Sequence, residues 1–181
     1  PYSVHPATAP SASPRSLFSV RVFVSFQVHL NFLDGWGLYR AYPELAGIGD
    51  GALAGRYFAH KTGAQHRCPD ASNPLLVTLL AEWMEEICTH FRPGGVNEIC
   101  CWLTERPAED GRPSTAAVGQ FVLEARAFVA AWERARLSYP ELTIRLFLST
   151  TSEQRDDVVL AEAPPEVKVV RIDVAGLAVK A

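Results

Sequence analysis

One stretch decides the fold of this chain: NEICCWLTE, residues 97–105. It is a compact apolar run that ends on a carboxylate, Glu105. Amphipathic segments precede and follow it, so we expect a central strand between two helices. The carboxyl end of a strand in a parallel sheet is where the chain leaves the core and where chemistry is usually done. Glu105 is therefore the leading site candidate, and the alternative is a solvated loop carboxylate.

The segment before this strand predicts a helix. It starts at Ser72-Asn73-Pro74, which offers a capping side chain and a proline for the first turn, and it stops at Pro93-Gly94-Gly95. Apolar residues recur between these ends at three-and-four spacing, as one buried helix face requires. They are Leu76, Leu79, Leu80, Trp83, Met84, Ile87 and Cys88.

The segments after the strand continue the alternation of helix and strand. We expect a helix capped by Ser114 with an apolar stripe over 121–135, a strand over 142–148, a helix over 152–161 and a strand over 166–174. This α-β-α-β-α-β order predicts parallel strands joined by helical crossovers. The predicted fold class is α/β, a parallel sheet with βα units. A closed eight-fold barrel takes about 250 residues, so we expect either a small open sheet or part of a TIM-barrel-like (β/α) fold, that is, an incomplete barrel.

The N-terminal part predicts a tail followed by a strand. Residues 1–16 are rich in Pro and Ser and bury too little apolar surface to fold, so they predict a disordered tail. Residues 17–181 are expected to form a single α/β domain. Within it, residues 19–32 alternate apolar and polar side chains and predict a strand, residues 33–40 a glycine-punctuated loop, and residues 52–61 a short helix.

Composition limits the classes of function. The net charge of −3 gives no basic footprint for nucleic acid, and no apolar run reaches the length of a membrane span. The four cysteines form no CxxC pair, so we expect four small buried hydrophobes, no metal and no cofactor. Phosphate-binding glycine loops, GxSxG and HExxH are absent from the sequence. Cys68 near His66 remains an alternative nucleophile. No signal peptide precedes Pro1, and cytoplasmic localisation is slightly favoured.

Polar side chains collect where the predicted strands end, and parallel strands share one carboxyl edge. Carboxylates and aromatic rings together are the composition of a sugar-binding site. The catalytic candidates are Glu105 as general acid with Asp34, Asp70 or Asp173 as its partner. The substrate-binding candidates are Trp36, Tyr39, Asn31, His66 and Arg67, with Trp102 as a further aromatic. The structural alternatives are that Asp34 caps a glycine turn and that Asp70 caps the helix beginning near Pro74.

Residues 64–174 resemble bacterial (β/α)-barrel proteins related to the α-glucuronidase and β-N-acetylhexosaminidase group of glycoside hydrolases. The resemblance lies in the Asn73-Pro74 helix start, the apolar strand ending at Glu105, and Pro164-Pro165 before the last strand. It implies that Glu105, at the end of the matching strand, is a catalytic acid. The loop after Glu105 is rich in Pro, Asp and Arg rather than Cys, and no tandem Asp-Glu pair follows the strand. Substrate-assisted hexosaminidase chemistry is therefore not implied.

Three hypotheses follow. The first is a glycoside hydrolase-like domain that acts on carbohydrate through Glu105. The second is a non-catalytic carbohydrate-binding or interaction domain on the same scaffold. The third is a truncated α/β fragment without activity, which would self-associate through an open sheet edge.

Overall fold

The computed structural model describes residues 26–30, 37–48, 68–91, 97–104, 111–148, 156–172 and 179–180. Of the predicted strand over 19–32 the structure describes residues 26–30, of which 26–29 form a strand, and the predicted helix over 52–61 lies outside the described residues.

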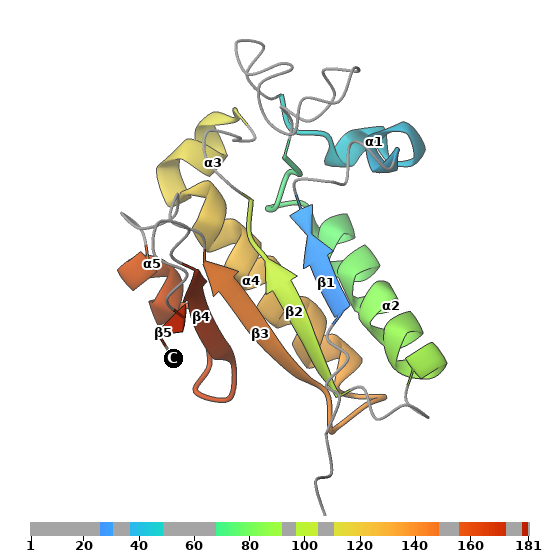
Figure 1. Cartoon of the computed structure of the whole chain (residues 1–181). Coiled ribbons are helices and arrows are strands. Elements are labelled where there is room, and N and C mark those ends of the chain that lie inside the picture. The colour runs from blue at the N-terminus through green and yellow to red at the C-terminus, as the bar shows by residue number, and fades with distance from the viewer. Residues whose placement is uncertain are drawn as a thin grey trace, which may run out of the picture.

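The strands of the sheet lie side by side in the order in which they occur in the sequence (Figure 1). The first four strands are parallel to one another, and the fifth is antiparallel to the fourth. They are β1 (Phe26–His29), β2 (Glu98–Trp102), β3 (Thr143–Leu148), β4 (Lys168–Ile172) and β5 (Val179–Lys180). The parallel α/β arrangement predicted from the sequence is thus confirmed, whereas the antiparallel β5 was not expected.

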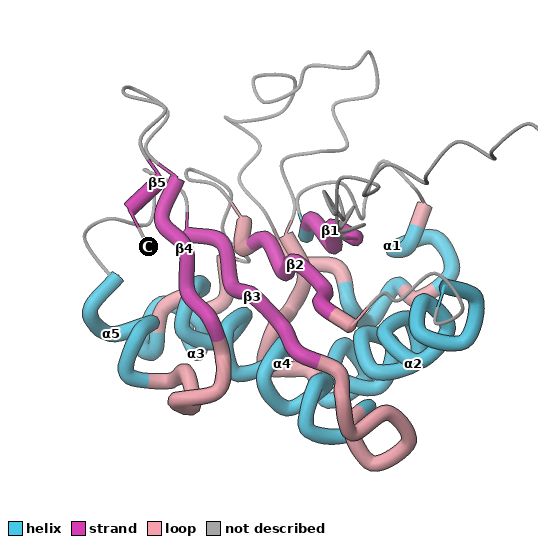
Figure 2. Tube along the Cα trace, turned by 60° about the horizontal axis from the view of Figure 1, so that its bottom comes forward, coloured by secondary structure: helices cyan, strands magenta, loops and turns pink. Residues whose placement is uncertain are grey.

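The longer helices lie on one face of this sheet (Figure 2). Helix α2 connects β1 to β2, α3 and α4 connect β2 to β3, and α5 connects β3 to β4. The helical elements are α1 (Leu38–Ala41), the short 3-10 turn η2 (Pro43–Leu45), α2 (Pro74–Phe91), α3 (Pro113–Val118), α4 (Gln120–Ala135) and α5 (Asp156–Ala161). No described helix is long and apolar enough to cross a membrane.

The core lies between the sheet and the helices α2 and α4. Successive strand residues point to opposite faces, so Ile99 and Cys101 of β2 join the core cluster while Cys100 lines a pocket on the other face. Phe128 of α4 and Met84 of α2 are completely buried in the same cluster. The expected apolar stripes of both helices therefore face the sheet.

Local sequence sets the start of α2. The Asn73 side chain accepts a hydrogen bond from the Leu75 amide at 3.0 Å, and Pro74 occupies the first helical position. This is the helix start expected from a capping residue followed by proline. Asp70 does not cap α2, because its carboxylate instead accepts a hydrogen bond from the Ser72 amide at 3.1 Å.

Three local predictions were wrong. The helix expected after Ser114 consists of two helices separated by Gly119, whose φ of 107° interrupts the helical path. Arg112, not Ser114, occupies the cap position of the first of them, and Pro113 begins it. The loop expected over 33–40 gives way to helix α1 at Leu38, because the left-handed Gly37 turns the chain into a helical segment.

Candidate functional site

Most of the sequence-predicted site residues lie outside the described residues. These are Glu105, Asp34, Asp173, Trp36, Asn31, His66 and Arg67. The structure does describe Asp70, Tyr39 and the residues that immediately precede Glu105 in the chain. The candidate site can therefore be built from the residues that surround the carboxyl ends of β1 and β2.

Glu124 of α4 holds the carboxyl end of β2. Its carboxylate is completely buried and accepts two hydrogen bonds from Thr104, one from the backbone amide at 2.8 Å and one from the hydroxyl at 2.7 Å. Thr104 is itself buried and lies two residues beyond the last residue of β2. The end of β2 is thus held by a carboxyl side chain from the helix layer.

The surroundings of Glu124 change its ionisation. Burial raises the pKa of the Glu124 carboxyl from 4.5 to about 7, because water no longer solvates the charge. The hydrogen bonds from Thr104 and Gln120 favour the charged form and oppose this effect, but burial prevails. A buried carboxyl that titrates near neutrality is a feature of functional sites, although structural networks also produce it.

Gln120 links this carboxylate to the segment before α2. Its amide nitrogen donates to Glu124 at 2.6 Å and also contacts the Pro69 carbonyl at 3.2 Å. Pro69 forms an isolated antiparallel bridge with Ala46, in the connection between β1 and α2. The connections that follow two neighbouring parallel strands are therefore tied together through the first turn of α4.

Asp70 and Arg112 complete the same network. Arg112 contacts the Asp70 carboxylate at 3.5 Å and donates a hydrogen bond to the Ala46 carbonyl at 3.0 Å. The Asp70 side chain is 14% exposed and that of Arg112 28%. We call these residues the carboxyl-edge network: Ala46, Pro69, Asp70, Thr104, Arg112, Gln120 and Glu124.

Tyr39, which the sequence placed among the sugar-contacting aromatics, lies in α1 and is only 5% exposed. It belongs to the core cluster. Trp102 has a different environment. It is the last residue of β2, is half-buried, and stacks on Phe147 of β3 with ring centroids 5.3 Å apart.

Trp102 and Phe147 lie on the sheet face opposite to the helices, which we call the helix-free face because no described helix covers it. They are paired in register near the carboxyl ends of β2 and β3. Phe147 borders a pocket of about 480 Å³ that extends over this face toward the amino ends of the strands. Phe147 is thus the member of the stacked pair that borders this space.

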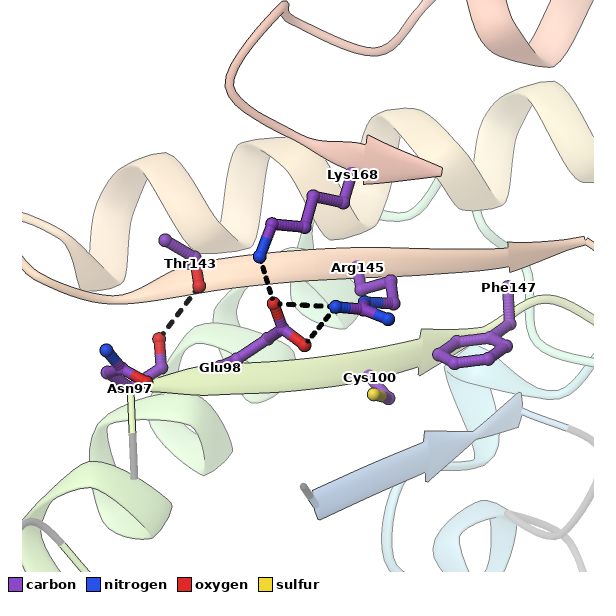
Figure 3. A pocket seen from close by; sticks show the side chains of 7 residues that line it. All are labelled: Asn97, Glu98, Cys100, Thr143, Arg145, Phe147 and Lys168. Carbon is purple, nitrogen blue, oxygen red and sulfur yellow. Dashed lines mark hydrogen bonds and ion pairs between the residues drawn. The ribbon is translucent and has the colours of Figure 1, made fainter. Parts of the chain in front are cut away.

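A cluster of charges occupies the other end of this pocket (Figure 3). The Glu98 carboxylate contacts Arg145 at 2.9 Å and Lys168 at 2.8 Å. Partial burial raises the pKa of Glu98, but the hydrogen bonds and charges of Lys168 and Arg145 outweigh it, so the pKa is lowered overall. This cluster joins β2, β3 and β4 at their amino-terminal ends, away from the carboxyl-edge network.

The four cysteines are all buried free thiols, as the sequence predicted. Burial raises the pKa of Cys101 well above its usual value, which keeps this thiol neutral. Cys68 is described but His66 is not, so the alternative nucleophilic pair lies partly outside the described residues. Within the described ranges, no three His, Cys, Asp or Glu side chains form a group that could hold a metal ion.

Sequence reasoning missed Glu124. It follows Phe121 by three residues and precedes Phe128 by four, so it shares the buried face of α4 with them. The sequence offered one indication: a single carboxylate stands at a core position of an apolar stripe, and such a group requires hydrogen-bond donors around it.

Comparisons with known proteins found no matching family model, curated protein or solved structure.

Proposed function

We propose that this chain is a glycoside hydrolase-like (β/α) domain whose carbohydrate site lies at the carboxyl ends of its parallel strands. Glu105 is the general acid in this proposal, and the stacked Trp102 and Phe147 form an apolar platform for a sugar ring. The observation that carries it is that Glu124 anchors Thr104 at the carboxyl end of β2. Thr104 is the residue immediately before Glu105 in the sequence.

The order of the strands supports the barrel part of the proposal. Strands β1 to β4 are parallel neighbours in sequence order, and the helices that connect them lie on the same face. Doubly wound sheets reverse their strand order and carry helices on both faces, whereas a (β/α) barrel keeps one order and one helical layer. In a barrel the helix-free face would point to the interior, and the carboxyl ends would form the catalytic rim.

The chemistry of the rim supports a carbohydrate ligand. Glycoside hydrolysis uses one protonated carboxyl group to donate a proton to the leaving oxygen. A second carboxylate either attacks the anomeric carbon of the sugar or activates a water molecule. Asp70, Asp34 and Asp173 are the proposed partners of Glu105. Asp70 is a member of the carboxyl-edge network together with Thr104, which places it in the same region of the protein as the end of β2.

Hydrolysis of paired aryl glycosides tests this proposal. We expect Glu105→Gln to lower kcat about a hundredfold or more on phenyl glycosides, because the leaving oxygen loses its proton donor. The loss should be smaller on para-nitrophenyl glycosides, whose leaving group departs without protonation. Glu109→Gln is the matched control, a carboxyl four residues further along the chain, and it should retain wild-type rates. Equal rates for Glu105→Gln and wild type on both substrates would overturn the role of Glu105.

A second candidate function is carbohydrate binding without catalysis. The stacked pair of Trp102 and Phe147 favours it, because aromatic platforms bind sugars without catalytic carboxyls. In this case wild type and Glu105→Gln would bind the same saccharide equally and neither would hydrolyse a glycoside.

A further inference from the structure

We propose that Glu124 is a positioning residue of the candidate site: its carboxylate fixes the orientation of Thr104 at the carboxyl end of β2, the residue that precedes the proposed acid Glu105 in the sequence. The effect on the reaction of Glu105 rests on the proposed function. The effect on the end of β2 does not, and it can be measured separately.

The first argument is the geometry of the contact. Glu124 uses both of its carboxylate oxygens on one residue, with Oε2 accepting from the Thr104 amide and Oε1 from the Thr104 hydroxyl. One hydrogen bond fixes a distance, whereas two from the same residue also fix the orientation of its peptide and side chain. When Glu124 is ionised, above about pH 7, these bonds are charge-assisted and stronger than bonds between neutral groups.

The second argument is the kind of side chain at this position. Glu124 faces the core from α4, where an apolar residue would avoid the cost of burying a charge. What a carboxylate supplies is two acceptors in one plane. A glutamine has one acceptor only, so its amide nitrogen would face either the Thr104 amide or the donors at Oε1. A glutamate at position 124 therefore serves to orient the end of β2 rather than to fill the core.

The third argument is that Gln120 holds the Glu124 carboxylate in place. Gln120 donates to the same Oε1 that accepts from the Thr104 hydroxyl, and its amide is held by the Pro69 carbonyl. Gln120 and Glu124 are four residues apart and share one face of α4. Because Pro69 precedes Asp70, the same helical turn sets the relative position of the end of β2 and of the Asp70 segment.

Amide hydrogen exchange on the full chain tests the positioning role. In Glu124→Gln we expect exchange of the Thr104 amide at least about tenfold faster than in wild type, since a donor at one end of the side chain then faces an amide nitrogen and the paired acceptors that order the strand end are lost. The amides of β3 should change much less. Glu133→Gln is the matched control, an exposed glutamate in the same helix. Unchanged exchange at Thr104, or equal acceleration throughout the sheet, would overturn the proposal.

A second pair of variants protects the test against misfolding of Glu124→Gln. Thr104→Val removes the hydroxyl and keeps the branched shape, whereas Thr104→Ser keeps the hydroxyl. The proposal predicts faster exchange of the residue 104 amide in Thr104→Val than in Thr104→Ser. Equal exchange in the two variants would contradict it.

Kinetics separate this inference from the proposed function. On phenyl glycosides, Glu124→Gln should lower kcat with little change in KM, because the substrate still binds while the acid is misdirected. Glu133→Gln should change neither constant. If wild type hydrolyses nothing while Thr104 loses protection in Glu124→Gln, the proposed function fails and the positioning role stands. If wild type is active and Glu124→Gln changes neither kcat nor the exchange of Thr104, the positioning role fails alone.

Discussion

At the scale of single residues, the buried carboxylate of Glu124 makes the stability of the protein depend on pH. Burial raises its pKa from the ordinary value of 4.5 to about 7. Between these two values the folded state binds a proton that the unfolded state does not bind. The free energy of unfolding therefore decreases as pH rises through this window, and the contribution of this group is fully present only below it.

We predict that titration of Glu124 makes the free energy of unfolding about 2 to 3 kcal/mol lower at about pH 8 than at about pH 5. Urea denaturation of wild type and Glu124→Gln across this range measures the effect, since the variant has no proton to bind at this position. Glu133→Gln should follow the wild-type curve. If the stabilities of Glu124→Gln and wild type run parallel with pH, the carboxyl of Glu124 does not titrate in this window.

The sequence predicted this region unevenly. Glu105 was singled out because an apolar strand that ends on a carboxylate is visible in the sequence itself. Glu124 was not, because its role depends on a contact with Thr104 across 20 residues of sequence. No local pattern encodes which strand end a helix face will meet.

At the scale of elements, Gly119 decides the geometry of the helix layer. It ends α3 and precedes α4, its φ is 107°, and its amide donates to the Thr115 carbonyl at 2.6 Å. Residues with a Cβ rarely adopt this conformation. The first turns of α4 carry Gln120 and Glu124, so the angle at Gly119 sets where these two side chains approach β2 and Pro69.

We predict that Gly119→Ala lowers the free energy of unfolding by about 1 to 3 kcal/mol, because alanine is strained at this φ. Urea denaturation checks the loss. Amide exchange should be accelerated most in the first two turns of α4 and at Thr104. Ala117→Gly, in the last turn of α3, is the control: it weakens the helix without requiring a positive φ. Stability equal to wild type in Gly119→Ala would show that the turn is not constrained.

Helices and strands with a clear period were predicted well, and breaks were not. The spacing of apolar residues identified α2 and the residues of β2 and β3 because burial on one face imposes that spacing. The apolar spacing over residues 121–135 identified α4 but begins only after Gly119, so it carried no information about a break at that residue. The break exists because the chain must redirect between α3 and α4, which is a requirement of the packed structure.

At the scale of the whole molecule, the sheet has one face covered by helices and one face without a described helix. Parallel sheets are usually covered on both faces. The sequence predicted the parallel order, because helical and strand patterns alternate. It did not predict which side the helices take, because that depends on the path of each connection over the sheet.

The helix-free face combines two kinds of surface. The amino ends of its strands carry the cluster of Glu98, Arg145 and Lys168, and the carboxyl ends carry the stacked Trp102 and Phe147. Only the aromatic end lies beside the strand end that leads into Glu105. The proposed carbohydrate site therefore lies at the aromatic end of this face. A substitution there should impair ligand binding, and a substitution elsewhere should not.

Saturation-transfer NMR with free N-acetylhexosamine and uronic acid saccharides tests this location most directly. We predict transfer to at least one saccharide in wild type and its loss in Trp102→Leu, which removes the aromatic platform and keeps an apolar side chain. Leu137→Ala, at a side chain that is 85% exposed in the turn after α4, should bind as wild type does. No transfer to any saccharide in wild type, or undiminished transfer in Trp102→Leu, would contradict a carbohydrate site at the carboxyl ends of these strands.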